Sequence, residues 1–201
     1  MKILIITDLH YWTNEEYQIT RNLTDYDICF LLGDISVEYL KELKGIIKTP
    51  LYGLNGNHDG ENVEAVGIEN LHGKCINFCG LTFSGFQGSA RYKSGPWCMY
   101  TQEESSEICE NIPRADIFIT HDGMLDVNNN DMAHAGLRGI SEYIENNNPT
   151  LHIHGHIHEN KERIIKHGSW LMGSKRKTTK SIAVYKAAII DTDTLNVEIL
   201  Y

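Results

Sequence analysis

Seven side chains of the types that hold divalent metal ions occur in five short clusters, and each cluster directly follows a short apolar run. Apolar runs of about four to eight residues predict buried strands. Ligand sites in α/β folds lie at the carboxyl ends of such strands. The chain is therefore expected to fold so that the five strand ends meet at one edge. The seven residues are Asp8, His10, Asp34, Asn57, His121, His156 and His158.

Apolar runs and helix-like segments alternate along the chain, which predicts an α/β fold with two packed mixed sheets flanked by helices. We expect strands at residues 2–7, 27–32, 50–54, 115–120 and 151–154, and helices at 14–25, 36–47, 101–111 and 133–147. Ser36 is the expected N-cap of the second helix. Thr101, with Glu104 three residues later, has the pattern of a capping box. Pro149 is expected to stop the last helix.

Two hairpins are expected in addition. Residues 74–78 and 81–86 are separated by a Cys-Gly pair, which favours a tight turn. Near the C-terminus, residues 181–190 and 194–200 have the alternating pattern of a second hairpin.

Length and composition predict one globular domain over residues 1–201, since the chain is 41% hydrophobic and contains only 4 Pro. Residues 2–6 have the pattern of a strand and lack that of a secretory signal. No apolar run reaches the roughly 18 residues that a membrane span needs. Five cysteines are an odd number, which favours reduced thiols. We therefore expect a cytoplasmic protein without membrane partners, whose oligomeric state the sequence leaves open.

The net charge of −9 disfavours a large nucleic-acid footprint, because phosphate backbones are held by clustered Lys and Arg. Nucleic acid stays a possible partner, since a cationic metal centre reverses the field locally. A small phosphoester is the favoured substrate.

The composition of the clusters suits a centre of two metal ions that share one carboxylate. Two Asp, four His and the neutral Asn57 bring a charge of −2 against +4 from two divalent ions. A bridging hydroxide leaves the centre near +1, which suits an anionic phosphate ester. Asp8 with His10, and His156 with His158, are spaced so that an extended segment points both side chains to one side. His58, next to Asn57, is the expected proton donor to the leaving group.

Taken in order, the motifs Asp8-x-His10, Gly33-Asp34, Gly56-Asn57-His58-Asp59, His121 and Gly155-His156-x-His158 resemble those of the calcineurin-like metallophosphoesterase superfamily. The resemblance spans residues 8–158 and implies a four-layer α/β/β/α sandwich with a dinuclear site. Manganese is the metal we expect, with iron, zinc and nickel as alternatives.

The resemblance also implies a division of the ligands. One metal would be held by Asp8, His10, Asp34 and His158. The other would be held by Asp34, Asn57, His121 and His156, so that Asp34 bridges the two. His152 and His154 have no ligand role in the family pattern, and we expect them to be structural.

The chain departs from the protein Ser/Thr phosphatase branch of the family at two positions. Val37 stands where that branch has an Asp that orients the catalytic His, and Asp59 stands where it has Glu. The partner that orients His58 is therefore open, with Asp59 and Glu38 as candidates. Asp59 favours the phosphodiesterases of the family.

Three further residues are candidates for substrate binding. Arg91 and Tyr92 lie in a long loop at residues 88–97 that suits either a phosphate or base contact or a solvated loop. His134 is either a substrate contact or part of a helix start.

The function that these residues favour is a metal-dependent phosphoesterase, which hydrolyses phosphodiesters and also monoesters by attack of a metal-bridged hydroxide. A nuclease acting on nucleic-acid ends is one alternative. A non-catalytic metal-binding scaffold of the same fold is the other, although the chain keeps His58 and every ligand.

Overall fold

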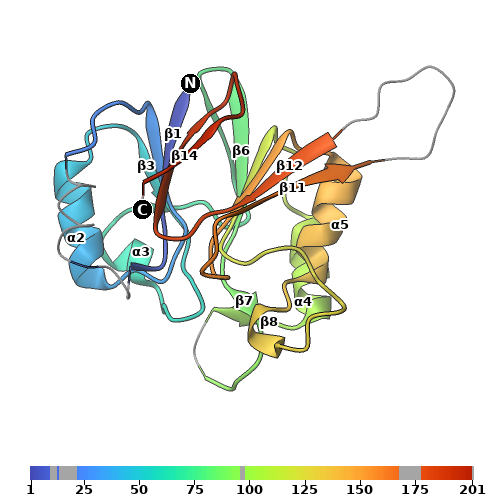
Figure 1. Ribbon diagram of the computed structural model, residues 1–201. Helices are drawn as coiled ribbons and strands as arrows, with labels where there is room; N and C mark the ends of the chain where they lie inside the picture. The colour runs from blue at the N-terminus through green and yellow to red at the C-terminus, as the bar shows by residue number, and fades with distance from the viewer. Residues whose placement is uncertain (10–12, 14–21, 96–97, 168–177, 201) are drawn as a thin grey trace, which may run out of the picture.

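The computed structural model of the chain describes residues 1–9, 13, 22–95, 98–167 and 178–200. Two six-stranded mixed sheets form its centre (Figure 1). In spatial order, the first sheet contains β14 (Val197–Ile199), β13 (Ala187–Asp191), β1 (Lys2–Ile6), β2 (Ile28–Leu31), β3 (Leu51–Gly53) and β4 (Glu69–Asn70). Strands β1 to β4 are parallel, so their carboxyl ends share one edge of the sheet. Strands β13 and β14 add an antiparallel hairpin beside β1.

The second sheet has the same mixed character. Its order is β11 (Lys161–Lys166), β12 (Thr178–Ala183), β10 (Leu151–His154), β9 (Ile117–Thr120), β6 (Leu81–Phe86) and β5 (Cys75–Phe78). The four central strands are parallel, and β11 and β5 are antiparallel edges. A small parallel pair, β7 (Ser89–Ala90) and β8 (Met99–Tyr100), lies at the lower end of the view in Figure 1.

Helices cover the outer face of each sheet, which confirms the predicted four-layer arrangement (Figure 1). The helices α2 (Val37–Ile46) and α3 (Asn62–Ala65) pack on the first sheet. The helices α4 (Gln102–Glu110) and α5 (Arg138–Asn147) pack on the second. The central core lies between the sheets, where Ile3, Phe30 and Phe83 are among the fully buried side chains. Burial of this apolar surface is the main stabilising contribution.

At three places the structure contains the local feature that the sequence predicts. The Ser36 hydroxyl caps α2 by accepting a hydrogen bond from the Tyr39 N–H. The capping box at α4 is complete, with Thr101 and Glu104 each bonding the backbone of the other. The β5–β6 hairpin turns at Cys79 and Gly80, whose φ angles are 50° and 82°.

Two predicted elements differ in the structure. The helix expected over residues 133–147 begins only at Arg138, after a separate 3₁₀ helix, η2 (Met132–His134). Gly136 has a φ of 76°, which a right-handed helix does not contain, so the helix cannot run through it.

The strand expected over residues 181–190 is instead two strands in different sheets. Strand β12 ends at Ala183 and β13 begins at Ala187, with Lys186 at a φ of 71° between them. The chain crosses from the second sheet to the first at this turn. The helix expected over residues 14–25 lies mostly outside the described residues, and residues 23–25 are not helical.

Among the helices that the structure describes, none is long and apolar enough to cross a membrane. All five cysteines lie within the described residues, and each is a free thiol.

Candidate metal centre

The loops that follow β1, β2, β3, β9 and β10 meet at one edge of the two sheets. Backbone hydrogen bonds join these loops, since the Asp8 N–H donates to the Gly33 carbonyl and the Gly155 N–H to that of His121. The loops carry five buried polar residues, which we call the polar cluster: Asp8, Asp34, Asn57, His121 and His156. All of them are less than 5% exposed. Residues from five strand ends are therefore brought together, as the order of motifs predicts.

His121 lies at the centre of the polar cluster, and its backbone contact fixes its tautomer. Its Nδ1 lies 2.6 Å from the Leu32 carbonyl oxygen, which can only accept, so Nδ1 carries the hydrogen. The other nitrogen, Nε2, lies 3.0 Å from Asn57 Oδ1 and 3.7 Å from Asp34 Oδ2. An imidazole lone pair facing two oxygens calls for a positive charge between them, either a proton or a metal ion. Burial lowers the pKa of His121, and the charges of Asp34 and Asp8 outweigh burial and raise it.

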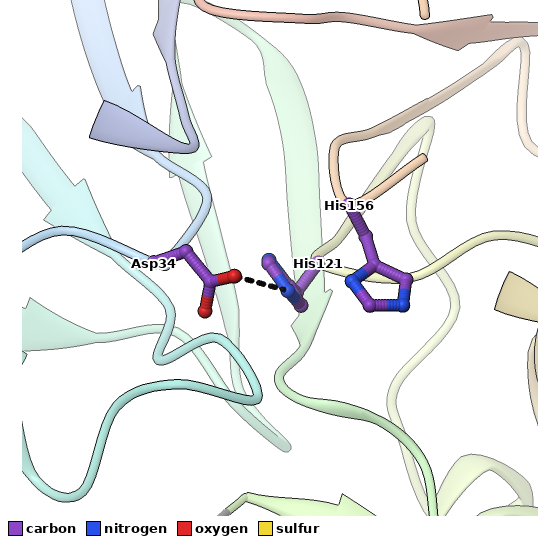
Figure 2. Close-up of side chains that lie close together, drawn as sticks. All are labelled: Asp34, His121 and His156. Carbon is purple, nitrogen blue, oxygen red and sulfur yellow. Dashed lines mark ion pairs between the residues drawn. The ribbon is translucent and has the colours of Figure 1, made fainter. Parts of the chain in front are cut away.

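His156 contributes a second imidazole to the same place. Its Nε2 lies 2.7 Å from the Ala133 carbonyl oxygen and donates to it, which leaves the Nδ1 lone pair free for a cation. Asp34, His121 and His156 offer ligand atoms that lie within 4.8 Å of one another. Figure 2 shows the three side chains turned toward each other, with His121 between the other two.

Asp8 has an oxygen that the described protein does not satisfy. Its Oδ2 accepts from the Thr7 hydroxyl at 2.8 Å and from the His156 N–H at 3.2 Å. Its Oδ1 is buried without a hydrogen-bond partner among the described residues, and lies 3.5 Å from His158 Nε2. Burial raises the pKa of Asp8, but the close contact with His158 and the charge of His121 outweigh it and hold the pKa at about 2. A buried, ionised oxygen without a donor fits a metal ligand.

The backbone of the expected ligands is unusual. Asp8, Asp34, His156 and His158 have φ angles of 54°, 55°, 67° and 51°, in the left-handed region that non-glycine residues rarely adopt. The extended geometry expected at the Asp8 and His156–His158 motifs is therefore wrong. Strain of this kind is typical of functional sites.

Three glycines allow the loops to approach this closely. A Cβ at Gly33 would lie 2.3 Å from the Gly56 nitrogen, and one at Gly56 would lie 2.1 Å from Asp34 Oδ1. A Cβ at Gly155 would lie 2.4 Å from the Thr7 hydroxyl oxygen. The Gly residues in the motifs are thus required by close contact between neighbouring loops.

His58 lies at the exposed side of the polar cluster, and its backbone N–H donates to Asp34 Oδ1 at 2.9 Å. Asp59, the next residue, contacts the backbone of two ligand loops. Its Oδ2 accepts from the N–H groups of Asp34 and Gly56, at 2.7 and 2.8 Å. Burial and the nearby Asp34 charge raise the pKa of Asp59 to about 6. Asp59 therefore fastens two ligand loops to each other, a role that its place in the sequence did not indicate.

The three candidate substrate residues lie in different settings. Tyr92 reaches the polar cluster, where its hydroxyl accepts a hydrogen bond from Asn57 Nδ2 at 3.2 Å. The Arg91 guanidinium is directed to the Met99 carbonyl and to Glu104, at 3.0 and 2.8 Å. The ring of His134 lies 4.9 Å from that of His156, and its Nδ1 lies 2.6 Å from Asp131 Oδ2. His10 lies outside the described residues, so its placement stays a prediction.

His152 and His154 are buried behind the polar cluster. Both ring nitrogens of His152 contact hydroxyl groups, of Thr120 at 2.9 Å and Ser181 at 2.8 Å. Burial lowers the pKa of His152 well below its usual value and that of His154 to about 4. Their contacts are those of structural histidines in neutral form.

A cavity of about 380 Å³ lies beside the polar cluster. Its lining includes His134, His154 and Ile157, together with the cationic side chains of Lys161 and Arg163 on β11. The loop that follows β9 also contributes to the lining, including Asp122 and Asp126.

A comparison with known protein families identifies the superfamily of the chain. The model described as the calcineurin-like phosphoesterase superfamily domain matches residues 1–194. The chain belongs to the calcineurin-like phosphoesterase superfamily. Members of this superfamily are metal-dependent phosphoesterases, and Asp34, His121 and His156 of the polar cluster form a candidate metal-binding group. No curated protein matches the chain.

Three solved structures share the fold of this chain at low sequence identity. The protein TT1561 of Thermus thermophilus is 14% identical, with a TM-score of 0.63, and the match covers 98% of this chain and 96% of that one. A novel archaeal phosphodiesterase is 15% identical, with a TM-score of 0.56 and 98% of both chains covered. The phosphopantetheinyl hydrolase of Mycobacterium tuberculosis is 10% identical, with a TM-score of 0.58, and the match covers 92% of this chain and 89% of that one.

Proposed function

We propose that this chain is a dinuclear metal-dependent phosphoesterase that hydrolyses phosphodiesters, with monoesters as a second substrate class. The observation that carries the proposal is the unsatisfied Asp8 Oδ1, buried at the same edge as the Nε2 of His121, which faces two oxygens. Both features are accounted for by cations at this edge. The fold shared with an archaeal phosphodiesterase and a phosphopantetheinyl hydrolase supports a phosphoester as substrate.

The proposed ligands divide between two metal ions. Asp8, His10, Asp34 and His158 would hold one, and Asp34, Asn57, His121 and His156 the other. Asp34 is the residue that we assign to both metals; its Oδ2 lies 3.7 Å from His121 Nε2, and its Oδ1 accepts from the His58 N–H. We propose manganese as the metal, with iron, zinc and nickel as alternatives. When bound, such ions supply Lewis-acid activation of water and bind phosphoryl oxygens.

The protein's own groups complete the site. His58 is exposed at the rim, where its imidazole would deliver a proton to the leaving-group oxygen. The Leu32 and Ala133 carbonyls hold the rings of His121 and His156 in fixed tautomers. The adjoining cavity has the volume of a small-molecule site, and its lining combines Lys161 and Arg163 with the acidic Asp122, Asp126 and Glu159.

Hydrolysis of bis(4-nitrophenyl) phosphate and of 4-nitrophenyl phosphate tests this function. We expect turnover of the diester with added Mn²⁺ and its loss after treatment with a chelator. If the chain binds Mn²⁺ but turns over neither ester nor single-stranded DNA, the scaffold alternative replaces the enzyme. Turnover of single-stranded DNA ends alone would instead favour the nuclease.

The role of His58 is tested separately by His58→Ala. We expect turnover to fall about a hundredfold while the bound metal stays nearly unchanged. The loss should be larger for diphenyl phosphate than for the 4-nitrophenyl ester, because phenolate is the poorer leaving group and needs the proton more. Glu61→Ala, at an exposed position in the same loop, is the matched control and should keep full turnover. Loss of metal in His58→Ala would contradict the proton-donor role.

A further inference from the structure

The segment from Gly88 to Tyr92 bridges two of the loops that carry proposed ligands. The Gly88 N–H donates to the Asn55 carbonyl at 2.8 Å, which ties the segment to the loop of Asn57. The Ala90 N–H donates to Asp122 Oδ2 at 3.1 Å, and Asp122 directly follows His121. Hydrogen bonds therefore fix the segment both to the loop of Asn57 and to the loop of His121.

Arg91 fixes the backbone immediately before Tyr92. Its N–H donates to the Tyr100 carbonyl at 2.9 Å, and its guanidinium bonds the Met99 carbonyl and Glu104. Glu104 lies in the first turn of α4 and also bonds the Thr101 N–H. These contacts give Arg91 the task of holding the segment.

Tyr92 meets the amide of Asn57 on the side away from His121. Its hydroxyl accepts from Nδ2 at 3.2 Å, while Asn57 Oδ1 lies 3.0 Å from His121 Nε2. Asn57 is 1% exposed, so water does not readily replace either contact. Among the described residues, Tyr92 is the acceptor that the structure shows for Nδ2.

We propose that Tyr92 is a positioning residue for the metal that Asn57 and His121 would share. The inference rests on the proposed metal centre. When Asn57 Oδ1 is bound to a cation, the amide cannot turn, and its Nδ2 hydrogens need an acceptor on the other side. Tyr92 supplies that acceptor. An N–H group left buried without a partner destabilises the state that contains it.

In the metal-free protein, losing the Tyr92 hydroxyl is less destabilising. Without a metal ion the Asn57 amide is not held by coordination and can turn, so its Nδ2 hydrogens do not depend on Tyr92 alone. Loss of the Tyr92 hydroxyl therefore destabilises the metal-bound state more than the metal-free state. The consequence is weaker binding at one of the two metal sites.

Calorimetric titration of the chelator-treated full chain with Mn²⁺ tests this with Tyr92→Phe. We expect the affinity of one site to fall about tenfold and that of the other to stay unchanged. Tyr100→Phe is the matched control, because the Tyr100 hydroxyl contacts Gln87 and His72 outside the polar cluster. It should leave both affinities unchanged.

The same substitution in a second variant distinguishes a positioning role of Tyr92 from a general loss of packing. The Asn57→Asp variant has no Nδ2 hydrogens to satisfy, so adding Tyr92→Phe to it should change the Mn²⁺ affinity less than about twofold. An equal loss in the Asn57 and Asp backgrounds would show a packing effect and overturn the inference. So would an unchanged affinity in Tyr92→Phe. If the unaltered chain binds no Mn²⁺, the proposed metal centre itself fails.

Discussion

At the scale of single residues, the polar cluster is a set of side chains held in unfavourable backbone conformations by their neighbours. Each left-handed non-glycine residue costs about 1–2 kcal/mol, and four of the proposed ligands have this conformation. Asp59 offsets part of this cost by bonding the N–H groups of Asp34 and Gly56. Such an arrangement is expected where ligand placement matters more than local stability.

Gly33→Ala tests how tightly the ligand loops are packed. The new Cβ would lie 2.3 Å from the Gly56 nitrogen, at a residue whose φ is already 98°. We expect the free energy of unfolding in urea to fall by about 3 kcal/mol. Gly45→Ala in α2 is the control, since a Cβ there meets nothing within 4 Å, and it should stabilise the protein by about 0.5 kcal/mol. Similar effects of the two substitutions would contradict the close contact of the loops.

His152 predicts a pH dependence of stability. The Thr120 hydroxyl donates to the Asp122 carbonyl, so it accepts from His152 Nε2–H, and Nδ1 then accepts from Ser181. The folded ring is neutral, and burial keeps its pKa well below the unfolded value of 6.5. As the pH falls below 6.5 the unfolded chain gains a proton that the folded chain does not, so stability is lost.

The comparison of His152→Gln with the unaltered chain isolates this contribution. In chelator-treated protein between about pH 6.5 and pH 5, the slope of unfolding free energy against pH should be shallower in the variant by about 1.4 kcal/mol per pH unit. Identical slopes in urea titrations of the two proteins would mean that His152 is charged in the folded state.

At the scale of secondary-structure elements, the sequence predicts what depends on neighbours along the chain. The buried strands were predictable because each is a short apolar run, and α2 and α4 because Ser36 and Thr101 supply their caps. The crossing at Lys186 was not predictable, because the apolar pattern continues through it into another sheet. The same limit applies to Tyr92 and Asn57, which are joined across 35 residues by the fold alone.

The cap of α4 gives a prediction at this scale. Thr101→Ala removes the hydroxyl that accepts from the Glu104 N–H, and should lower the free energy of unfolding by about 1 kcal/mol. Ser106→Ala, inside the same helix, should change it by less than about 0.5 kcal/mol. The Arg91–Glu104 pair survives in both variants, so Mn²⁺ affinity should not change. Weaker metal binding in Thr101→Ala would show that α4 controls the centre directly.

At the scale of the whole molecule, parallel strands in two packed sheets explain why residues spread over about 150 positions could be predicted to share one site. The strand ends share an edge, so motif order and strand position were sufficient to group the residues that the structure describes. The carbonyls that fix the His tautomers, of Leu32 and Ala133, were not predictable in this way. Backbone groups carry no residue identity, so no motif marks them.

The number of metal ions per chain tests the central claim most directly. After equilibrium dialysis against Mn²⁺ and removal of free metal, elemental analysis should find two ions per unaltered chain, and two in the His152→Gln control. His121→Ala should retain one, because it removes a ligand of only one of the proposed sites. No bound metal in the unaltered chain, or two ions in His121→Ala, would contradict the dinuclear centre.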